Sequence, residues 1–181
     1  MSNIAVVYKS KYGSTKKYAQ WVAEETNADL FENSKTDVRD LIQYDTIVYG
    51  GGLYASGIAG ISLITKNYEV LKDKRIVVFT VGLASTDRKE VFYSIIEKNF
   101  SQEMCDNIEF FHLRGGIDYK KLGFIHRSMM AMLKTVISKK DPEELTDDDR
   151  ELLATYGDKI DFTDKNSLKP LLVFLGNEKA K

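Results

Sequence analysis

The fold of this chain is decided by residues 4–15, Ile4-Ala5-Val6-Val7-Tyr8-Lys9-Ser10-Lys11-Tyr12-Gly13-Ser14-Thr15. The apolar residues 4–8 are typical of a short buried strand, and a helical pattern begins near Thr15. A helix N-terminus attracts anions, because its first N–H groups have no partner within the helix and its dipole is positive there. Hydroxyl groups can donate to a phosphate, and glycine lets the backbone approach it. We therefore predict a phosphate site formed by Ser10, Lys11, Tyr12, Gly13, Ser14 and Thr15.

This loop does not follow the glycine patterns of the common nucleotide-binding motifs. It lacks G-x-x-x-x-G-K-[ST], which excludes a P-loop, and it lacks G-x-G-x-x-G, which excludes a dinucleotide fingerprint. Taken alone, the same residues are also compatible with a serine-rich turn that caps a helix. Its position directly after the first strand favours phosphate binding.

The composition predicts one domain with a substantial hydrophobic core. The chain has 181 residues, of which 43% are hydrophobic, and this excludes global disorder. The net charge of −1 gives no overall bias toward nucleic acid. The single cysteine, Cys105, excludes a disulfide framework and a cysteine metal cluster. We see no signal peptide and no apolar run long enough to span a membrane, so we expect a cytoplasmic protein.

Strand and helix patterns alternate along the first 112 residues. We predict strands over 4–8, 29–32, 46–49, 75–81 and 108–112, with the third strand ended by the glycines 50–52. Helices are expected over 15–26, 37–42, 61–71 and 91–100, and a closing helix over 166–176. This order of short buried strands and helices predicts an α/β fold with a doubly wound five-stranded parallel sheet.

Residues 113–162 interrupt this alternation, and we interpret them as a helical insertion within a single domain of residues 1–181. An apolar helix is expected over 124–137. A second helix is expected to begin at Asp141-Pro142-Glu143-Glu144 and to end near Gly157. The two histidines, His112 and His126, have no metal-ligand spacing, and we expect surface or core roles for both.

Charge is segregated within the insertion. Residues 114–140 carry seven basic residues and one acid, whereas residues 141–151 carry seven acids and one base. The two halves can neutralise each other as antiparallel helices. Alternatively, the basic helix 120–140, with Met129, Met130 and Met132, makes a peripheral contact with anionic lipid or docks on a partner protein.

Three loops are expected to form one site. In an open doubly wound sheet the ligand lies beyond the carboxyl ends of the strands, and for the order 2-1-3-4-5 this place is between strands one and three. The phosphate loop, residues 50–57 and residues 81–86 all emerge there. The second loop offers glycine backbone and an aromatic face to a flat ring, and the third offers backbone N–H groups to a pyrimidine edge. The predicted cofactor-binding residues of these two loops are Gly51, Gly52, Leu53, Tyr54, Ala55, Val81, Gly82, Leu83, Ala84 and Ser85.

The pattern S-x-x-G-x-T after the first strand, together with these loops, resembles the flavodoxin family over residues 1–112 and the final helix. The resemblance implies that residues 10–15 hold the 5′-phosphate of FMN and that the flavin ring lies between the loops 52–54 and 82–84. It implies no catalytic side chain, and we predict no metal. Receiver domains share this topology but need acids after strands one and three, where this chain has Tyr8-Lys9-Ser10 and Tyr49-Gly50-Gly51.

The sequence of the insertion indicates a particular branch of the flavodoxin-like proteins. Leu113-Arg114-Gly115-Gly116, Tyr119 and Leu122, followed by a basic amphipathic helix, resemble the flavodoxin-like branch that contains menaquinone-dependent protoporphyrinogen oxidases. This implies an FMN-dependent oxidoreductase acting on a small molecule or quinone together with a redox partner. An electron-transfer flavodoxin and a non-redox binding module stay open as alternatives. The near-neutral charge disfavours the shuttle, because shuttle flavodoxins are usually strongly acidic.

Overall fold

A computed structural model describes residues 3–55 and 57–176. Its main sheet has five parallel strands in the order β2-β1-β3-β5-β6, which is the predicted order 2-1-3-4-5. A short strand, β4, pairs antiparallel with the end of β3. The strands are β1 (Ile4–Lys9), β2 (Asp29–Glu32), β3 (Thr46–Tyr54), β4 (Gly57–Ile58), β5 (Arg75–Gly82) and β6 (Ile108–Arg114).

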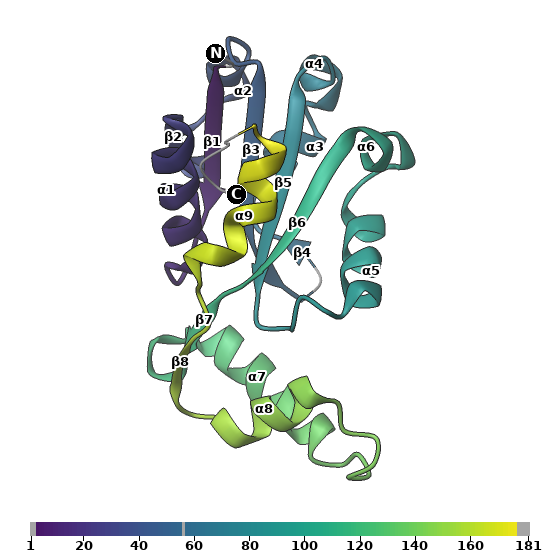
Figure 1. Cartoon of the computed structure of the whole chain (residues 1–181). Helices are drawn as coiled ribbons and strands as arrows, with labels where there is room; N and C mark the ends of the chain where they lie inside the picture. The colour runs from purple at the N-terminus through teal and green to yellow at the C-terminus, as the bar shows by residue number, and fades with distance from the viewer. Residues whose placement is uncertain (1–2, 56, 177–181) are drawn as a thin grey trace.

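Helices cover both faces of this sheet (Figure 1). On one face, α1 and α9 pack on alternate strand residues such as Val6, Val48 and Val77. On the other face, the helices between β2 and β6 pack on Ala5 and Ile47 and on their neighbours. Burial on both faces explains why the central strands β1, β3 and β5 contain few polar residues, whereas the edge strand β2 is mostly exposed. The helices are α1 (Ser14–Thr26), α2 (Val38–Leu41), α3 (Ser62–Thr65), α4 (Tyr68–Leu71), α5 (Lys89–Asn99), α6 (Gln102–Asn107) and α9 (Lys169–Phe174), with a 3-10 turn at Lys165–Leu168 before α9.

The segment that follows β6 lies beyond the carboxyl ends of the strands, at the lower end of the molecule in Figure 1. It is not purely helical as predicted, because two strands pair antiparallel where the segment leaves and rejoins the main fold. Ile117, Tyr119 and Leu122 form its small hydrophobic core. Its elements are β7 (Gly116–Asp118), a 3-10 turn at Tyr119–Lys121, α7 (Phe124–Ile137), α8 (Asp147–Thr155) and β8 (Lys159–Asp161).

The third strand is longer than predicted, because the glycines 50–52 lie within it. Gly50 and Gly51 pair in register with both β1 and β5, and Gly52 pairs with β5. A Cβ on Gly50 would lie 2.2 Å from Cζ of Phe79, and one on Gly51 would lie 2.4 Å from Cγ2 of Ile58. The glycines therefore allow close packing inside a strand instead of ending it.

Three predicted helices have clearly different bounds in the structure. The closing helix expected over 166–176 is a 3-10 turn at Lys165–Leu168 followed by α9, which ends at Phe174. The helix expected over 61–71 is two short helices, because the Asn67 side chain donates to the carbonyl of Leu63 at 2.8 Å where the helix breaks. The second insertion helix begins at Asp147, not Asp141, because Thr146 and Asp149 form a capping box that fixes its start. Residues 141–144 form a turn. Helix α6 and the strands β4, β7 and β8 were not predicted.

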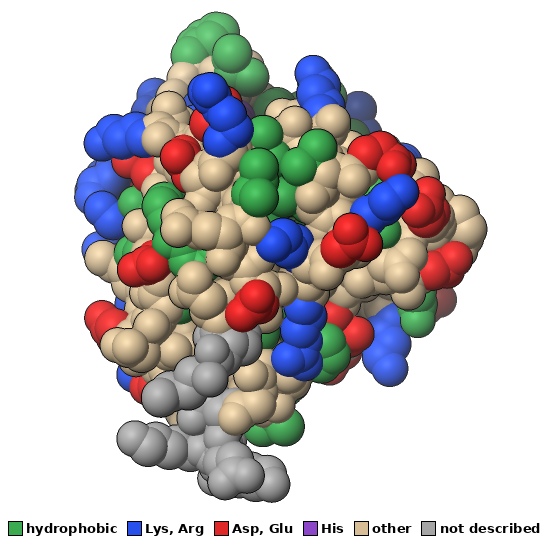
Figure 2. All heavy atoms as spheres, turned by 90° about the horizontal axis from the view of Figure 1, so that it is seen from above, with side chains coloured by type: hydrophobic (Ala, Val, Ile, Leu, Met, Phe, Trp, Pro, Cys, Tyr) green, Lys and Arg blue, Asp and Glu red, His purple; other side chains and the backbone are tan. Residues whose placement is uncertain are grey.

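Viewed over the amino ends of the strands, basic and acidic side chains are interspersed with scattered hydrophobic ones (Figure 2). None of the helices within residues 3–55 and 57–176 has the combination of length and apolar character that crossing a membrane requires.

Candidate cofactor site

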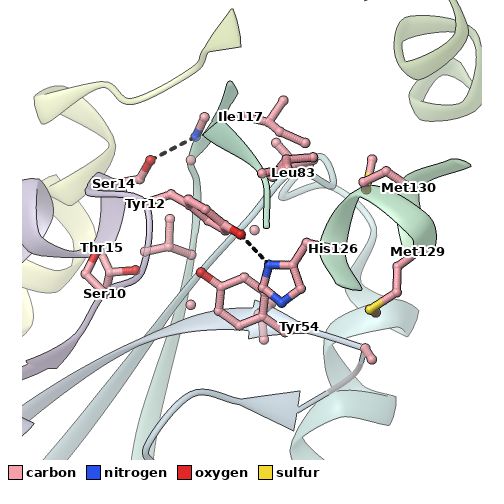
Figure 3. Close-up of a pocket in the computed structure, with 18 residues that line it drawn as sticks. Ser10, Tyr12, Ser14, Thr15, Tyr54, Leu83, Ile117, His126, Met129 and Met130 are labelled. Atoms are coloured by element: carbon pink, nitrogen blue, oxygen red, sulfur yellow. Dashed lines mark hydrogen bonds between the residues drawn. The ribbon is translucent and has the colours of Figure 1, made fainter. Parts of the chain in front are cut away.

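A cavity of about 170 Å³ lies at the carboxyl ends of β1, β3 and β5, where the three predicted loops meet. The loop before α1, the end of β3 and the end of β5 form part of its wall, and the insertion closes the rest (Figure 3). The wall is mostly apolar, as is usual for a cofactor pocket. The cavity is lined by Ser10, Tyr12, Ser14, Thr15, Gly52, Leu53, Tyr54, Ala55, Val81, Gly82, Leu83, Gly115, Gly116, Ile117, Leu122, His126, Met129 and Met130.

The first backbone N–H groups of α1 have no side-chain acceptor among the described residues. Gly13 is its N-cap with a φ of 104°, a left-handed conformation that glycine adopts without strain, and no described side chain caps the first turn. The Ser10 hydroxyl oxygen accepts from the Gly13 N–H at 3.1 Å, and that of Ser14 accepts from the Gly116 N–H at 3.0 Å. Because both hydroxyls act as acceptors there, their protons remain free to donate. Uncapped N–H groups and nearby hydroxyls fit a phosphate.

Three aromatic rings from distant parts of the chain meet beside this helix end (Figure 3). The Nδ1 atom of His126 lies 2.7 Å from Oη of Tyr12, within hydrogen-bonding distance. The His126 ring also stacks on Tyr54, with the ring centroids 4.8 Å apart and the planes at 14°. Tyr12 meets Tyr54 edge to face, with centroids 6.4 Å apart. A face of Tyr54 that could hold a flat cofactor ring is thus covered by a side chain of the insertion.

The site carries little charge of its own. None of the described residues that line the cavity is Asp, Glu, Lys or Arg. Loss of water around the ring, and then the positive charge of Lys11, lower the pKa of His126 below its usual 6.5, which favours the neutral imidazole. Burial, and then the nearby Tyr12, raise the pKa of Tyr54, so its phenol stays protonated. Within the described part of the chain, no group of His, Cys, Asp or Glu side chains is arranged to hold a metal ion.

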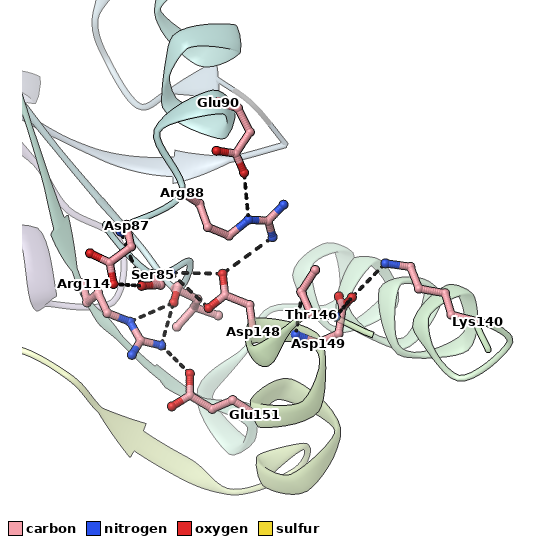
Figure 4. Close-up of polar contacts among 11 residues, drawn as sticks. Ser85, Asp87, Arg88, Glu90, Arg114, Lys140, Thr146, Asp148, Asp149 and Glu151 are labelled. Atoms are coloured by element: carbon pink, nitrogen blue, oxygen red, sulfur yellow. Dashed lines mark hydrogen bonds and ion pairs between the residues drawn. The ribbon is translucent and has the colours of Figure 1, made fainter. Parts of the chain in front are cut away.

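The third loop is held by the insertion (Figure 4). The backbone N–H of Ser85 donates to the two carboxylate oxygens of Asp148 at 3.2 and 3.1 Å. Arg114 donates from Nη2 to the carbonyl of Leu83 at 3.0 Å and pairs with Glu151. The Ser85 N–H, predicted to face a pyrimidine edge, is therefore already used by a carboxylate of α8.

The structure brings together most of the predicted site residues but not all of them. Lys11 borders a neighbouring hollow that also contains Lys121, and Gly13 forms the turn before α1. Gly51 is buried within β3, while Ala84 lines a second cavity. Ser56, in the second predicted loop, lies outside the described residues. The predicted residues that line the cavity are Ser10, Tyr12, Ser14, Thr15, Gly52, Leu53, Tyr54, Ala55, Val81, Gly82 and Leu83.

The sequence indicated that the insertion could shape the pocket, but it did not show which residues of the insertion line this cavity. His126 was expected to have a surface or core role, yet it lies against the two tyrosines of the site. The spacing of His126, Met130 and Ile137 along one face of α7 was the available signal, but it did not show what that face covers. His112 has a structural role, because its Nδ1 lies 2.7 Å from Thr80 Oγ1 and its ring stacks on Phe92. The missed lining residues are Gly115, Gly116, Ile117, Leu122, His126, Met129 and Met130.

Comparison with known proteins identifies the family. The family model described as flavodoxin domain matches residues 5–145, so the chain belongs to the flavodoxin domain family. Membership supports, in general terms, a flavin-binding redox protein. None of the curated proteins compared with the chain matches it.

Several solved structures are similar to the chain. The flavodoxin, WrbA-like protein from Agrobacterium tumefaciens is 20% identical with a TM-score of 0.44, over 62% of this chain and 83% of that one. Flavodoxin 2 from Bacillus cereus is 18% identical with a TM-score of 0.42, over 62% and 84% of the two chains. The Trp repressor binding protein from Bacillus subtilis is 16% identical with a TM-score of 0.44, over 62% and 85%.

Proposed function

We propose that this chain binds FMN and acts as an oxidoreductase that passes electrons between a small molecule or quinone and a redox partner. The observation that carries the proposal is the uncapped N-terminus of α1, with the hydroxyls of Ser10, Ser14 and Thr15 beside it, at the edge of a mostly apolar cavity. A phosphate suits the helix end, and a flat ring suits the apolar wall. Bound FMN would supply the electron transfer, while the protein supplies binding, access and electrostatics.

The site favours a mononucleotide over a dinucleotide. The loop between β1 and α1 contains Gly13 but lacks the glycine pattern that brings a pyrophosphate close to a helix. Its hydroxyl-rich sequence instead surrounds one helix end, which suits a terminal phosphate. Family membership supports a flavin, and this loop chemistry supports FMN among the flavins.

The cavity has to widen before it can hold the cofactor. Its volume is about 170 Å³, whereas pockets for ligands of this size are roughly 300–1,000 Å³. The His126 ring covers one face of Tyr54 and is carried by α7, outside the main sheet. We infer that His126 leaves Tyr54 when the cofactor enters.

The insertion supports an enzyme acting on small molecules over a shuttle between proteins. Leu122, His126, Met129 and Met130 cover the cavity from outside the sheet. A partner protein would have to approach the flavin through this cover, whereas a small molecule can enter beside it. The resemblance to the protoporphyrinogen oxidase branch supports a porphyrinogen or a quinone as the small molecule.

Titration of purified protein with FMN, riboflavin and FAD, followed by absorbance and flavin fluorescence, tests the cofactor assignment. We expect FMN to bind most tightly and riboflavin more weakly, because riboflavin lacks the phosphate. Equal affinity for FMN and riboflavin would show that the helix end is not the phosphate site. Failure to bind any flavin would overturn the proposed function.

The acceptor is tested after chemical reduction of the FMN-loaded protein. We expect rapid reoxidation by a soluble quinone and slow reoxidation by an electron-accepting protein such as cytochrome c. The reverse order of rates would favour the electron shuttle over the oxidoreductase.

A further inference from the structure

Helix α7 exposes a row of large apolar side chains. Phe124 is 86% exposed, Ile125 and Met132 are each 70% exposed, and Val136 is 56% exposed. At 100° per residue, Ile125, Met132 and Val136 fall on one side of the helix, whereas the buried Ile137 lies on another side and lines the second cavity. Contiguous exposed apolar surface of this kind marks an interaction site. We call it the α7 stripe, and it consists of Phe124, Ile125, Met129, Met132, Leu133 and Val136.

The surroundings of the α7 stripe are basic. No Asp or Glu lies between Asp118 and Asp141, whereas six basic residues do. They stand before the helix, within it and after it, so cationic side chains flank both ends of the stripe. The Lys121 side chain is 76% exposed, and its Nζ lies 3.9 Å from a carboxylate oxygen of Asp118. The six are Lys120, Lys121, Arg127, Lys134, Lys139 and Lys140.

The acidic half of the insertion neutralises only part of this charge. Glu151 pairs with Arg114, and Asp149 pairs with Lys140 at 2.8 Å. Asp148 faces the third loop and not α7. The exposed acids of the turn 141–147 follow the C-terminal end of α7. The basic character is therefore strongest at the N-terminal end, where the most exposed apolar residues also lie.

We propose that the α7 stripe docks on a membrane surface that contains anionic lipid. Apolar side chains of an interfacial helix enter the boundary between headgroups and acyl chains, and flanking lysines contact the anionic headgroups. The helix has 14 residues, fewer than the roughly 20 needed to cross a bilayer, so it would lie in the plane of the interface. The basic residues around the α7 stripe attract anionic lipid, whereas they would repel the equally basic surface of a second copy of the chain.

Docking in this way would bring the cavity to the lipid. Met129 belongs both to the α7 stripe and to the cavity wall. A small molecule dissolved in the membrane would then reach the cavity directly, a consequence that rests on the proposed function. Membrane binding itself does not depend on the cofactor and is tested separately.

Co-flotation with vesicles tests the proposal, using phosphatidylcholine alone and phosphatidylcholine mixed with phosphatidylglycerol. We expect binding to the anionic vesicles that weakens as salt is raised. The triple variant Phe124→Ser, Ile125→Ser and Met132→Ser should bind the anionic vesicles at least about tenfold more weakly, because buried apolar area drives insertion. Val70→Ser, at an exposed apolar position on α4, should leave binding unchanged. Lys120→Gln with Lys121→Gln should weaken binding and flatten its salt dependence.

Circular dichroism and FMN titration of each variant separate loss of docking from loss of folding or of the cofactor site. Retained FMN binding with lost vesicle binding supports the proposal. Absence of binding to anionic vesicles, or equal binding to neutral ones, would overturn it. Light scattering tests whether a second copy of the chain covers the α7 stripe instead. If the wild type is a dimer that the serine substitutions dissociate, the stripe serves self-association and not membrane docking. Weak or absent FMN binding with normal vesicle binding would count against the proposed function only.

Discussion

The imidazole Nδ1 of His126 lies 2.7 Å from the phenolic oxygen of Tyr12, a residue 114 positions earlier in the sequence. This contact joins the insertion to the loop that precedes α1. The same imidazole ring stacks on Tyr54 from the end of β3. A single side chain of α7 thus contacts two of the three segments predicted to surround the cofactor.

Replacement His126→Ala should strengthen FMN binding. In the structure His126 must leave Tyr54 before a ring can cover it, and this costs a stacking contact of about 0.5–1.5 kcal/mol and a hydrogen bond of similar size. We expect a rise in affinity of several-fold, measured by quenching of FMN fluorescence. Ser128→Ala, at an exposed position on the same helix, is the matched control. Unchanged or weaker binding by His126→Ala would show that His126 does not obstruct the site.

The double variant Ser10→Ala and Thr15→Ala should weaken FMN binding. Each lost hydrogen bond to a charged phosphate costs roughly 1.5–3 kcal/mol. Riboflavin should bind the variant and the wild type alike, because it has no phosphate. Thr26→Ala, in the last turn of α1 where the hydroxyl donates to the Val22 carbonyl, controls for general effects on the helix. Tight FMN binding by the double variant would exclude this phosphate site.

Replacing residues 116–162 by a short linker should leave the main sheet folded and FMN bound. The excision points are close in space, since Gly116 and Asp161 are paired partners and the Phe162 N–H donates to the Gly115 carbonyl at 3.1 Å. We expect FMN still to bind but quinone reduction to be lost. Loss of both fold and FMN, seen by circular dichroism and flavin titration, would show that residues 113–162 are part of the core and not an inserted module.

The parallel sheet could be predicted because each strand and helix is marked by a pattern of neighbouring residues in the sequence. Residues 4–8 and 75–81 are apolar runs between helical patterns, and their order specifies the topology. The end of the third strand was predicted wrongly at the glycines 50–52, because the sequence does not show that Phe79 and Ile58 pack against Gly50 and Gly51. The start of α8 was misplaced because a cap, a proline and early acids at residue 141 suggest a helix as strongly as the capping box at Thr146.

The site was only partly predictable for the same reason. The helix end at Ser14 and the ring of Tyr54 follow from loops that the sheet topology brings together. The contacts of His126 and Asp148 depend on how the insertion folds back over the carboxyl ends of the strands. That path is set by β7 pairing with β8 and by packing around Ile117, which no local pattern reveals.

Stability should fall as the pH drops from 6.5 toward 4, partly because of His112. Burial lowers the pKa of His112 to about 4, below its usual value near 6.5. The unfolded chain therefore binds a proton in this range that the folded protein does not, so unfolding is favoured as pH falls. We expect wild type to lose about 1–2 kcal/mol more than His112→Gln between pH 7 and pH 5, after allowance for partial solvation. Urea unfolding at both pH values measures this. Equal losses would show that His112 titrates normally in the folded protein.

The potential of bound FMN should respond strongly to one carboxylate placed in the cavity wall. The described lining residues include no acid, so the electron added in the second reduction step meets no carboxylate in the cavity wall itself. Ala55 lies in the wall with a φ of 48°, a conformation that Asp and Asn tolerate better than most residues. A unit charge about 10 Å from the flavin contributes roughly 1–2 kcal/mol at an effective dielectric constant near 20. Ala55→Asp should therefore lower the second potential by about 40–90 mV, whereas the neutral Ala55→Asn should not. Potentiometric titration followed by absorbance measures both. A wild-type potential as negative as that of strongly acidic shuttle flavodoxins, or equal potentials in the Asp and Asn variants, would contradict the charge argument and favour the electron shuttle.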